Sequence, residues 1–157
     1  MKIRKAIVAD APAAHKLIND FASLQLMLPR SLNAIYGNIR EYFVCYEDDL
    51  IVGVCALHIL WENLAEVKSL AVLPSNQRRG IGGQLVRHCL EESSALGVNR
   101  VFALTYVPDF FIKCGFEKID KSDLPHKTWS DCINCPKFPS CDEQAVIINL
   151  QGISCLI

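Results

Sequence analysis

An arginine- and glycine-rich turn is the stretch of this sequence best suited to chemistry. It reads Asn-Gln-Arg-Arg-Gly-Ile-Gly-Gly from Asn76 to Gly83, and an amphipathic helical pattern follows it. The first N–H groups of a helix have no partner inside the helix and carry partial positive charge. Glycine lets an anion approach such groups closely, and Arg78 and Arg79 supply full charges for phosphate oxygens. The turn therefore predicts a phosphate site, with an ordinary surface turn as the alternative.

Two widespread phosphate motifs do not fit the spacing of this turn. A P-loop needs Gly-Lys followed by serine or threonine, and the chain has no such run. A dinucleotide fingerprint needs a third glycine three residues after Gly82, where this chain has Leu85. What is left is the pattern Gln77-x-x-Gly80-x-Gly82 between an apolar β-type run and a helix.

The segments around the turn predict an α/β domain with a mixed, mostly antiparallel central sheet flanked by helices. Alternating and β-branched runs predict strands at 2–8, 42–60, 65–74, 100–106, 116–120 and 144–150, with a hairpin turn at Asp48–Asp49 inside the second run. Helical spacing predicts helices from Ala11 to about Leu24, from Ser31 through Tyr42, from Gly80 to Leu96 and from Pro108 to Gly115. Asp10 and Ser31 are the expected caps of the first two helices. The element order predicts one parallel junction around the helix that begins at Gly80.

The composition favours a soluble cytoplasmic protein that folds as a single domain over residues 1–157. Half of the residues are hydrophobic (51%), which is enough for a sizeable core at this length. The 16 basic and 17 acidic residues nearly balance, so nothing favours a nucleic-acid partner. The apolar run before Asp10 is too short for a signal peptide, and no stretch approaches the roughly 20 apolar residues of a membrane span.

Seven of the eight cysteines fall into two groups. Cys45, Cys55, Cys89 and Cys114 stand singly in apolar patterns, where a reduced cysteine is usually a small core residue. Cys132, Cys135 and Cys141 cluster in a polar loop, residues 126–143, before the last strand. This cluster could hold zinc with His126 or Asp142 as a fourth ligand, but a stiff proline-containing loop or a reversible disulfide fits as well. We expect no metal, and any ion present to be structural.

The turn and its surroundings together resemble the GCN5-related N-acetyltransferase (GNAT) family. The β-type run 65–74, the Gln77-x-x-Gly80-x-Gly82 turn, the long helix and the later "FFIKCGF" follow in the family's order, and the resemblance covers about residues 2–150. It implies acetyl-coenzyme A as acetyl donor, with the pyrophosphate on the turn and the pantetheine arm beside the preceding strand. The implied cofactor contacts are Leu70, Ala71, Val72, Gln77, Arg78, Arg79, Gly80, Ile81, Gly82, Gly83 and Phe111.

The resemblance also implies roles in the acetyl transfer. Glu66 stands where the family often carries a general base, although a solvated carboxylate on a strand is the plain alternative. A backbone N–H near Leu70 would polarise the thioester carbonyl. Many members have a tyrosine where this chain has Phe111, and phenylalanine cannot protonate the departing thiolate. Tyr106 is the expected substitute, with Thr105 or solvent as alternatives.

The acceptor is expected to be the α-amine of an amino acid, a small-molecule substrate. Arg30 has the fork geometry for a carboxylate, and Lys68 points to the same strand face as Glu66. With the flanking segments they resemble the short N-acetyltransferases of the N-acetylglutamate synthase type, which implies L-glutamate and arginine biosynthesis. The alternative acceptors are another amino acid, a polyamine or a protein amine. The alternative function is a non-catalytic acetyl-CoA-binding module. A homodimer is compatible with the sequence.

Overall fold

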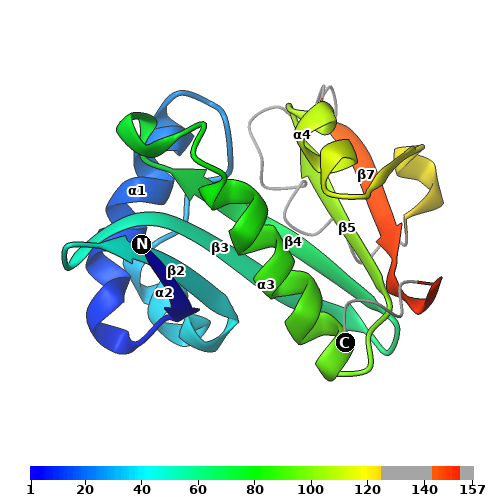
Figure 1. Ribbon diagram of the computed structural model, residues 1–157, viewed down its shortest axis with the longest axis horizontal. Helices are drawn as coiled ribbons and strands as arrows, with labels where there is room; N and C mark the ends of the chain where they lie inside the picture. Colours follow the sequence, from blue (N-terminus) through cyan, green and yellow to red (C-terminus); the bar gives the residue numbers. More distant parts are fainter. Residues whose placement is uncertain (125–142, 153–157) are drawn as a thin grey trace. The chain divides into compact units, whose positions relative to one another are not determined.

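The computed structural model describes residues 1–124 and 143–152, and its elements are drawn in Figure 1. By its internal contacts the chain divides into two compact units. The first unit comprises Met1–His58 and Val67–Glu92, and the second comprises Ile59–Glu66 and Ser93–Ile157. The strands are β1 (Lys2–Lys5), β2 (Tyr42–Glu47), β3 (Leu50–Trp61), β4 (Leu64–Val72), β5 (Arg100–Thr105), β6 (Glu117–Ile119) and β7 (Gln144–Asn149). The α-helices are α1 (Ala11–Ser23), α2 (Leu32–Gly37), α3 (Ile81–Ala95) and α4 (Pro108–Lys113).

The described strands are hydrogen-bonded in the order β1-β2-β3-β4-β5-β7-β6. Antiparallel pairing joins β1 to β2, β2 to β3, β5 to β7 and β6 to β7. The parallel pair is β4 with β5, where Ala65 and Glu66 lie beside Val101 and Phe102. These pairings confirm the predicted mixed, mostly antiparallel sheet with a parallel junction around the helix that follows the glycine turn. No helix among the described residues has the length and apolarity of a membrane span.

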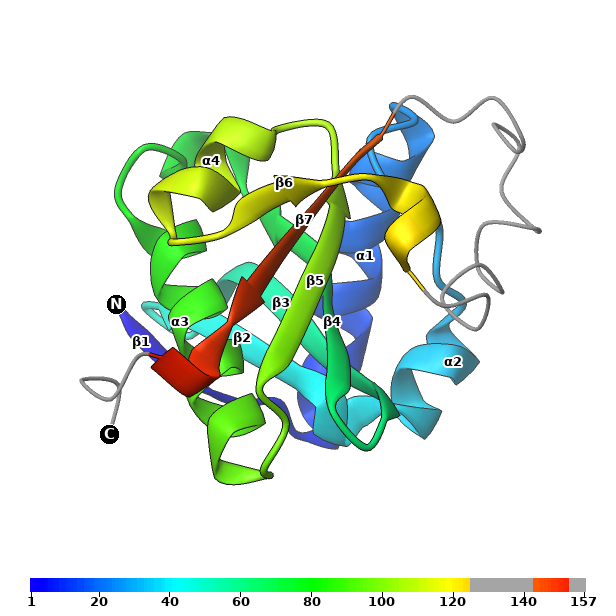
Figure 2. The same cartoon turned by 90° about the vertical axis from the view of Figure 1, so that its right-hand side faces the viewer.

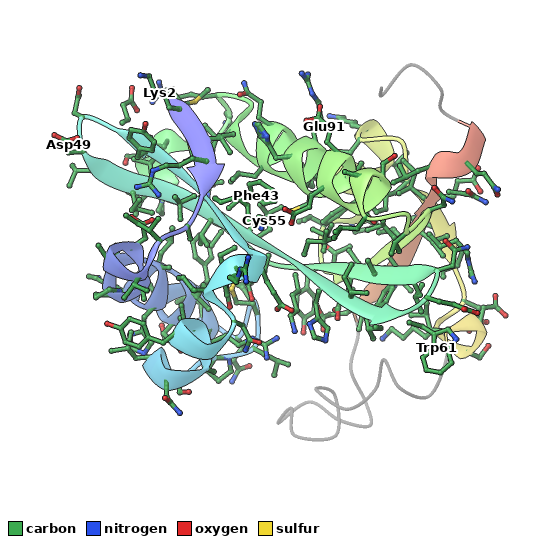
Figure 3. All side chains as sticks on the ribbon, turned by 90° about the horizontal axis from the view of Figure 1, so that it is seen from below. Lys2, Phe43, Asp49, Cys55, Trp61 and Glu91 are labelled. Atoms are coloured by element: carbon green, nitrogen blue, oxygen red, sulfur yellow. The ribbon has the colours of Figure 1, made fainter. Side chains whose placement is uncertain are left out.

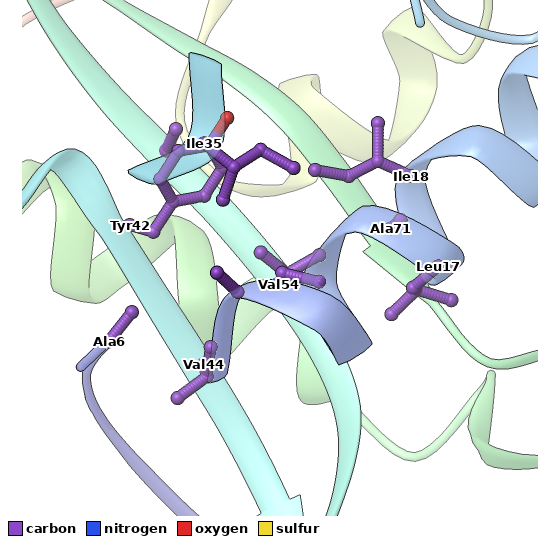
Figure 4. Packing of buried hydrophobic residues seen from close by; sticks show 11 residues of the cluster. Ala6, Leu17, Ile18, Ile35, Tyr42, Val44, Val54 and Ala71 are labelled. Atoms are coloured by element: carbon purple, nitrogen blue, oxygen red, sulfur yellow. The ribbon is translucent and has the colours of Figure 1, made fainter. Parts of the chain in front are cut away.

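In the first unit, one face of the strands packs against α1 and α2 and the other face packs against α3. Both faces are used because successive side chains of a strand point to opposite faces. Tyr42, Val44 and Val54 face α1 and α2 and pack in one buried cluster with Ile18 and Ile35 (Figure 4). The residues between them on β2 and β3 face α3, as Figure 3 shows for Phe43 and Cys55.

On the α3 side, glycine and cysteine let the helix pack close to the sheet. A Cβ at Gly53 of β3 would lie 3.1 Å from both Ile81 Cγ2 and Leu85 Cδ1 of α3. Further along the helix, the buried sulfurs of Cys55 and Cys89 are 3.7 Å apart. The hydrogen bond to Cys89, together with burial, raises the pKa of the Cys55 thiol well above its ordinary value, which makes it an inert core residue.

In the second unit, β7 lies between β5 and β6 (Figure 2). Its buried cluster contains Leu64, Phe102, Leu124 and Ala145. Helix α4 contributes the buried ring of Phe111, which packs edge-to-face on its neighbours Phe110 and Phe116.

Two features of the first helices differ from the sequence prediction. Asp10 does not cap α1 with its side chain, because a 3-10 turn precedes the helix and the carboxylate turns back. It accepts a hydrogen bond from the Ile7 N–H at 2.8 Å and pairs with Arg4 at 2.6 Å. The second helix is capped by Ser31 as predicted, but it ends at Gly37. Tyr42 instead begins β2, where its ring enters the core cluster.

The structure also tests the predictions for four cysteines and for the ends of two helices. Cys45, Cys55 and Cys89 are buried and reduced as expected, and Cys114 is partly buried. Leu24 and Leu96, which were the expected last residues of two helices, are exposed because each lies just beyond the last turn of its helix.

The close packing of α3 on β3 gives a first prediction. Gly53→Ala should lower the free energy of unfolding by about 1–3 kcal/mol, the usual cost of overpacking, because Ile81 and Leu85 are buried and have little room to move. Urea unfolding measures it. Gly37→Ala is the matched control, since a Cβ there meets nothing within 4 Å of the described residues. Equal stability of the Gly53→Ala protein and the wild type would show that α3 has room to shift.

Candidate active site

The loop between β4 and α3, residues 73–80, is held in place by three of its own side chains. Gln77 donates its amide hydrogen to the carbonyl of Val72 at the end of β4, with an Nε2–O distance of 3.0 Å. Arg79 donates from both terminal nitrogens to the carboxylate of Glu47 on β2, at 2.9 and 3.0 Å. Asn76 donates to the same carboxylate at 3.2 Å. The loop is therefore fixed to two neighbouring parts of the first unit.

The loop backbone leaves its N–H groups available where α3 begins. Arg78 and Gly80 have positive φ angles of 65° and 81°, and left-handed residues in a turn point successive N–H groups the same way. The Gly80 carbonyl accepts the first helical bond, from the Gln84 N–H at 3.1 Å. Within residues 1–124 and 143–152, nothing accepts a hydrogen bond from the N–H groups of residues 80–83. Together with the partial positive charge of a helix N-terminus, these groups have the chemistry that an anion site needs.

The space above the loop fits a ligand that comes close to the backbone. A Cβ added at Gly80 or Gly83 would meet no described atom within 4 Å. A glycine inside a helix costs stability relative to alanine, and no packing in the described structure requires one at Gly83. The exposed Arg78 side chain belongs to the same loop. The chemistry of this donor set suits a pyrophosphate.

Strand β4, which leads into the loop, carries a bend that the sequence does not predict. Ser69 has a φ of 56°, a left-handed conformation that is rare for a residue other than glycine and typical of a bulge. The pairing of β4 with β5 covers Ala65–Glu66, so Leu70–Val72 lie outside it. The main chain of these three residues is where the resemblance to the GNAT family implies the pantetheine arm.

A cationic side chain lies near this bend. The backbone of Arg30 is clamped by the side chain of Asn19 in α1, which accepts from the Arg30 N–H at 3.2 Å and donates to its carbonyl at 2.8 Å. Burial raises the pKa of the Tyr42 hydroxyl, and the nearby charge of Arg30 and a hydrogen bond from Ser69 partly offset that rise. The first unit therefore brings Arg30, Tyr42 and the bulge together, with Lys68 next to the bulge in sequence.

The other residues predicted for the site belong to the second unit. Glu66 is partly buried on β4, and Tyr106 is partly buried just after β5. The buried Thr105 hydroxyl accepts a hydrogen bond from the Val107 N–H at 2.9 Å, so it serves the turn that leads to α4. Phe111 is 4% exposed, and its ring is part of the packing of that unit. The catalytic role of Glu66 and Tyr106, and the cofactor contact of Phe111, stay predictions.

Sequence reasoning missed two polar pairs of the first unit. His58 Nδ1 on β3 lies 2.7 Å from Glu41 Oε2, just before β2, and Glu47 holds Arg79 and Asn76 as described above. Such partners are far apart in the chain, so no local pattern identifies them. The cysteine cluster that was considered for zinc but not favoured, with Cys132, Cys135, Cys141, His126 and Asp142, lies outside the described residues. In the rest of the chain, no group of three or more histidine, cysteine or acidic side chains could hold a metal ion.

Several known proteins have related sequences. Residues 38–118 match the acetyltransferase (GNAT) domain. An uncharacterized N-acetyltransferase of Chlorobaculum tepidum is 40% identical over 148 residues, covering 94% of this chain and 96% of that protein. An amino-acid acetyltransferase of Mycobacterium tuberculosis is 35% identical, covering 82% of this chain and 75% of that protein. The amino-acid acetyltransferase of Neisseria meningitidis is 29% identical over 83% of this chain, which spans only 30% of that longer protein.

Solved structures agree with this likeness. A Mycobacterium tuberculosis protein in complex with CoA has a TM-score of 0.81 at 28% identity, covering 96% of this chain and 99% of that one. N-acetylglutamate synthase of Neisseria gonorrhoeae, complexed with coenzyme A and N-acetyl-glutamate, has a TM-score of 0.86 at 25% identity, covering 95% of this chain and 35% of that one. The sheet order, the turn that opens α3 and these matches agree: the chain belongs to the GNAT family of N-acetyltransferases, in which acetyl-CoA is the acetyl donor.

Proposed function

We propose that this protein acetylates the α-amine of an amino acid, L-glutamate in the first place, and serves arginine biosynthesis in the cytoplasm. The related proteins of Mycobacterium tuberculosis and Neisseria meningitidis are amino-acid acetyltransferases, and the Neisseria gonorrhoeae structure contains N-acetyl-glutamate. In this chain, the proposal depends on the position of Arg30. The Asn19 side chain holds the Arg30 backbone, and Arg30 lies close to Tyr42, which is hydrogen-bonded to Ser69 of β4.

Binding of the donor is assigned to the loop and to the end of β4. The N–H groups of residues 80–83 would hold the pyrophosphate, with Arg78 adding charge. The main chain of Leu70–Val72 would pair with the pantetheine arm as an added strand would. Acetyl-CoA supplies an activated acyl group, and the N–H of Leu70, which follows Ser69 in β4, would polarise its carbonyl.

Proton transfers are assigned to two side chains of the second unit. Glu66 takes a proton from the acceptor amine, directly or through a water, because a protonated amine cannot attack a carbonyl. Tyr106 protonates the departing thiolate in place of the tyrosine that many family members have at the position of Phe111.

The acceptor preference follows from charge. A dicarboxylic amino acid loses hydration at two carboxylates when it binds, and an unpaired buried carboxylate is costly. Arg30 offers a bidentate partner for the α-carboxylate, and Lys68 offers a point charge for the side-chain carboxylate. Glutamine has nearly the same size but presents a neutral amide to Lys68.

A non-catalytic acetyl-CoA-binding module is the second candidate, and one observation favours it. Phe111, at the position of the family's tyrosine, is a buried core residue with no proton to give. Such a module would bind acetyl-CoA and release no free thiol with any amine, so a thiol-release assay over the twenty amino acids separates the two candidates.

Donor binding gives the second prediction. Gly82→Asp puts a negative side chain on the first turn of α3 and should abolish measurable acetyl-CoA binding. Arg78→Ala should weaken binding by roughly 10- to 100-fold, the scale of one charge-assisted hydrogen bond. Isothermal calorimetry measures both, with circular dichroism as the check on folding. Wild-type affinity in a folded Gly82→Asp protein would remove the pyrophosphate from this loop.

The proposed base gives the third prediction. Glu66→Gln should lower kcat by ~10²–10⁴, the usual contribution of a general base. The loss should shrink as the pH rises, because more of the acceptor amine is then already deprotonated. Steady-state rates between about pH 6.5 and 9.5 test this. A ratio of mutant to wild-type rate that does not change over this range would count against Glu66 as the base.

The acceptor gives the fourth prediction. Arg30→Ala should remove most activity on every amino acid, whereas Lys68→Met should mainly remove the preference for L-glutamate over L-glutamine, because unpaired polar groups discriminate strongly between substrates. The measurement is kcat/KM for both acceptors in the wild type and in both variants. A wild type that prefers glutamine, or an amine without a carboxylate, would refute the glutamate assignment and leave the acetyltransferase intact.

A further inference from the structure

We propose that Glu47 is a positioning residue for acetyl-CoA, which holds the loop in its binding shape through Arg79 and Asn76. The proposal rests on the assignment of the pyrophosphate to the N–H groups at the start of α3. It gives Arg79 a different role from the one expected from the sequence, which was direct contact with phosphate. In the structure, both terminal nitrogens of Arg79 are bound to the Glu47 carboxylate.

The anchor lies beside a tight turn. Glu47 is the last residue of β2 and pairs with Leu50 across the hairpin. The two turn residues, Asp48 and Asp49, have φ angles of 51° and 64°, which is the tight turn that matches the twist of two strands. The backbone position of Glu47 is therefore well defined, and a planar, two-pronged bond from an arginine to its carboxylate fixes direction as well as distance.

The loop requires such an anchor because Arg78 is held in an unfavourable conformation. Its φ of 65° is uncommon for a residue with a Cβ, and such residues persist only where the surroundings impose them. Both of its neighbours are fixed, Gln77 by the carbonyl of Val72 and Arg79 by Glu47. Release of Arg79 would let Arg78 relax, and the N–H groups that follow would no longer point the same way.

The charge balance supports the same role. The hydrogen bond from Arg79 lowers the pKa of Glu47, so the carboxylate is ionised at neutral pH and the two charges cancel. Their cancellation keeps a negative group beside an anion site from repelling the ligand. Removing either partner alone would leave one charge without its counter-charge.

Two roles for Arg79 predict opposite results for one substitution. If Arg79 only holds the loop, Glu47→Gln should weaken acetyl-CoA binding, because the amide that replaces the carboxylate offers a single neutral acceptor. If Arg79 binds phosphate directly, Glu47→Gln should leave the affinity unchanged or increase it, because the arginine is then free to reach the ligand. Direct binding would therefore overturn the proposal.

The experiment compares acetyl-CoA affinity by calorimetry with KM and kcat in Glu47→Gln, Arg79→Ala and the double variant. Each single change should raise Kd and the acetyl-CoA KM by about 5- to 20-fold, with kcat at saturating acetyl-CoA within about twofold of the wild type. The double variant should lose no more than the singles, because they break one interaction. The exchange Glu47→Arg with Arg79→Glu should recover much of the affinity, which a phosphate-binding arginine could not do from position 47.

Control variants distinguish the role of Glu47 from the pyrophosphate assignment on which it rests. Glu91→Gln breaks an ordinary exposed ion pair with Arg87 on α3 and should leave affinity unchanged. In the absence of acetyl-CoA, trypsin should cleave after Arg78 or Arg79 faster in Glu47→Gln than in the wild type. If Gly82→Asp and Arg78→Ala retain wild-type affinity, the pyrophosphate assignment fails. If they lose affinity while Glu47→Gln does not, only the role of Glu47 fails.

Discussion

The backbone N–H groups at the start of α3 are the constraint on which the site depends. They cannot bond within the helix, and the described chain offers them no acceptor, so an anionic ligand is their natural partner. Their direction is set by how α3 lies on the sheet. Gly53 permits the close contact with Ile81 and Leu85 at the first turns of the helix, and the Cys55–Cys89 contact continues it toward the middle.

Side chains and main chain have separate tasks in this loop. Gln77, Asn76 and Arg79 bind other parts of the protein, and the ligand is left to the backbone and to Arg78. In the proposed binding mode, a backbone site is specific for shape and charge and needs no recognition of the adenine.

Most of the fold was predictable because it follows from local periodicity. A few neighbouring residues decide the hairpin at Asp48–Asp49 and the cap at Ser31. The same holds for the turns that follow α3 and α4, where Gly97 and Gly115 have φ angles of 84° and 100°. The secondary structure at Tyr42 was not predictable. The spacing of apolar residues up to Tyr42 also suits a helix, and it is the packing of its ring in the core that favours a strand.

The parts of the site that escaped prediction depend on contacts between distant segments. Nothing around Ser69 marks a left-handed residue, because serine adopts that conformation only when the surrounding structure imposes it. Asp10 has the sequence of a helix cap, but Arg4 and the Ile7 N–H compete for its carboxylate and hold it. Glu47 and Arg79 are 32 residues apart, so their pairing is visible only in the folded chain.

The most direct test of the account is amide NMR of the labelled protein, titrated in parallel with coenzyme A and with pantetheine, which lacks the pyrophosphate. Coenzyme A should shift the amide protons of Ile81, Gly82 and Gly83 downfield, as expected for new hydrogen bonds to an anion, and should also shift those of Leu70–Val72. Pantetheine should shift only the β4 amides. Amides at the start of α3 that do not respond to coenzyme A would contradict the account.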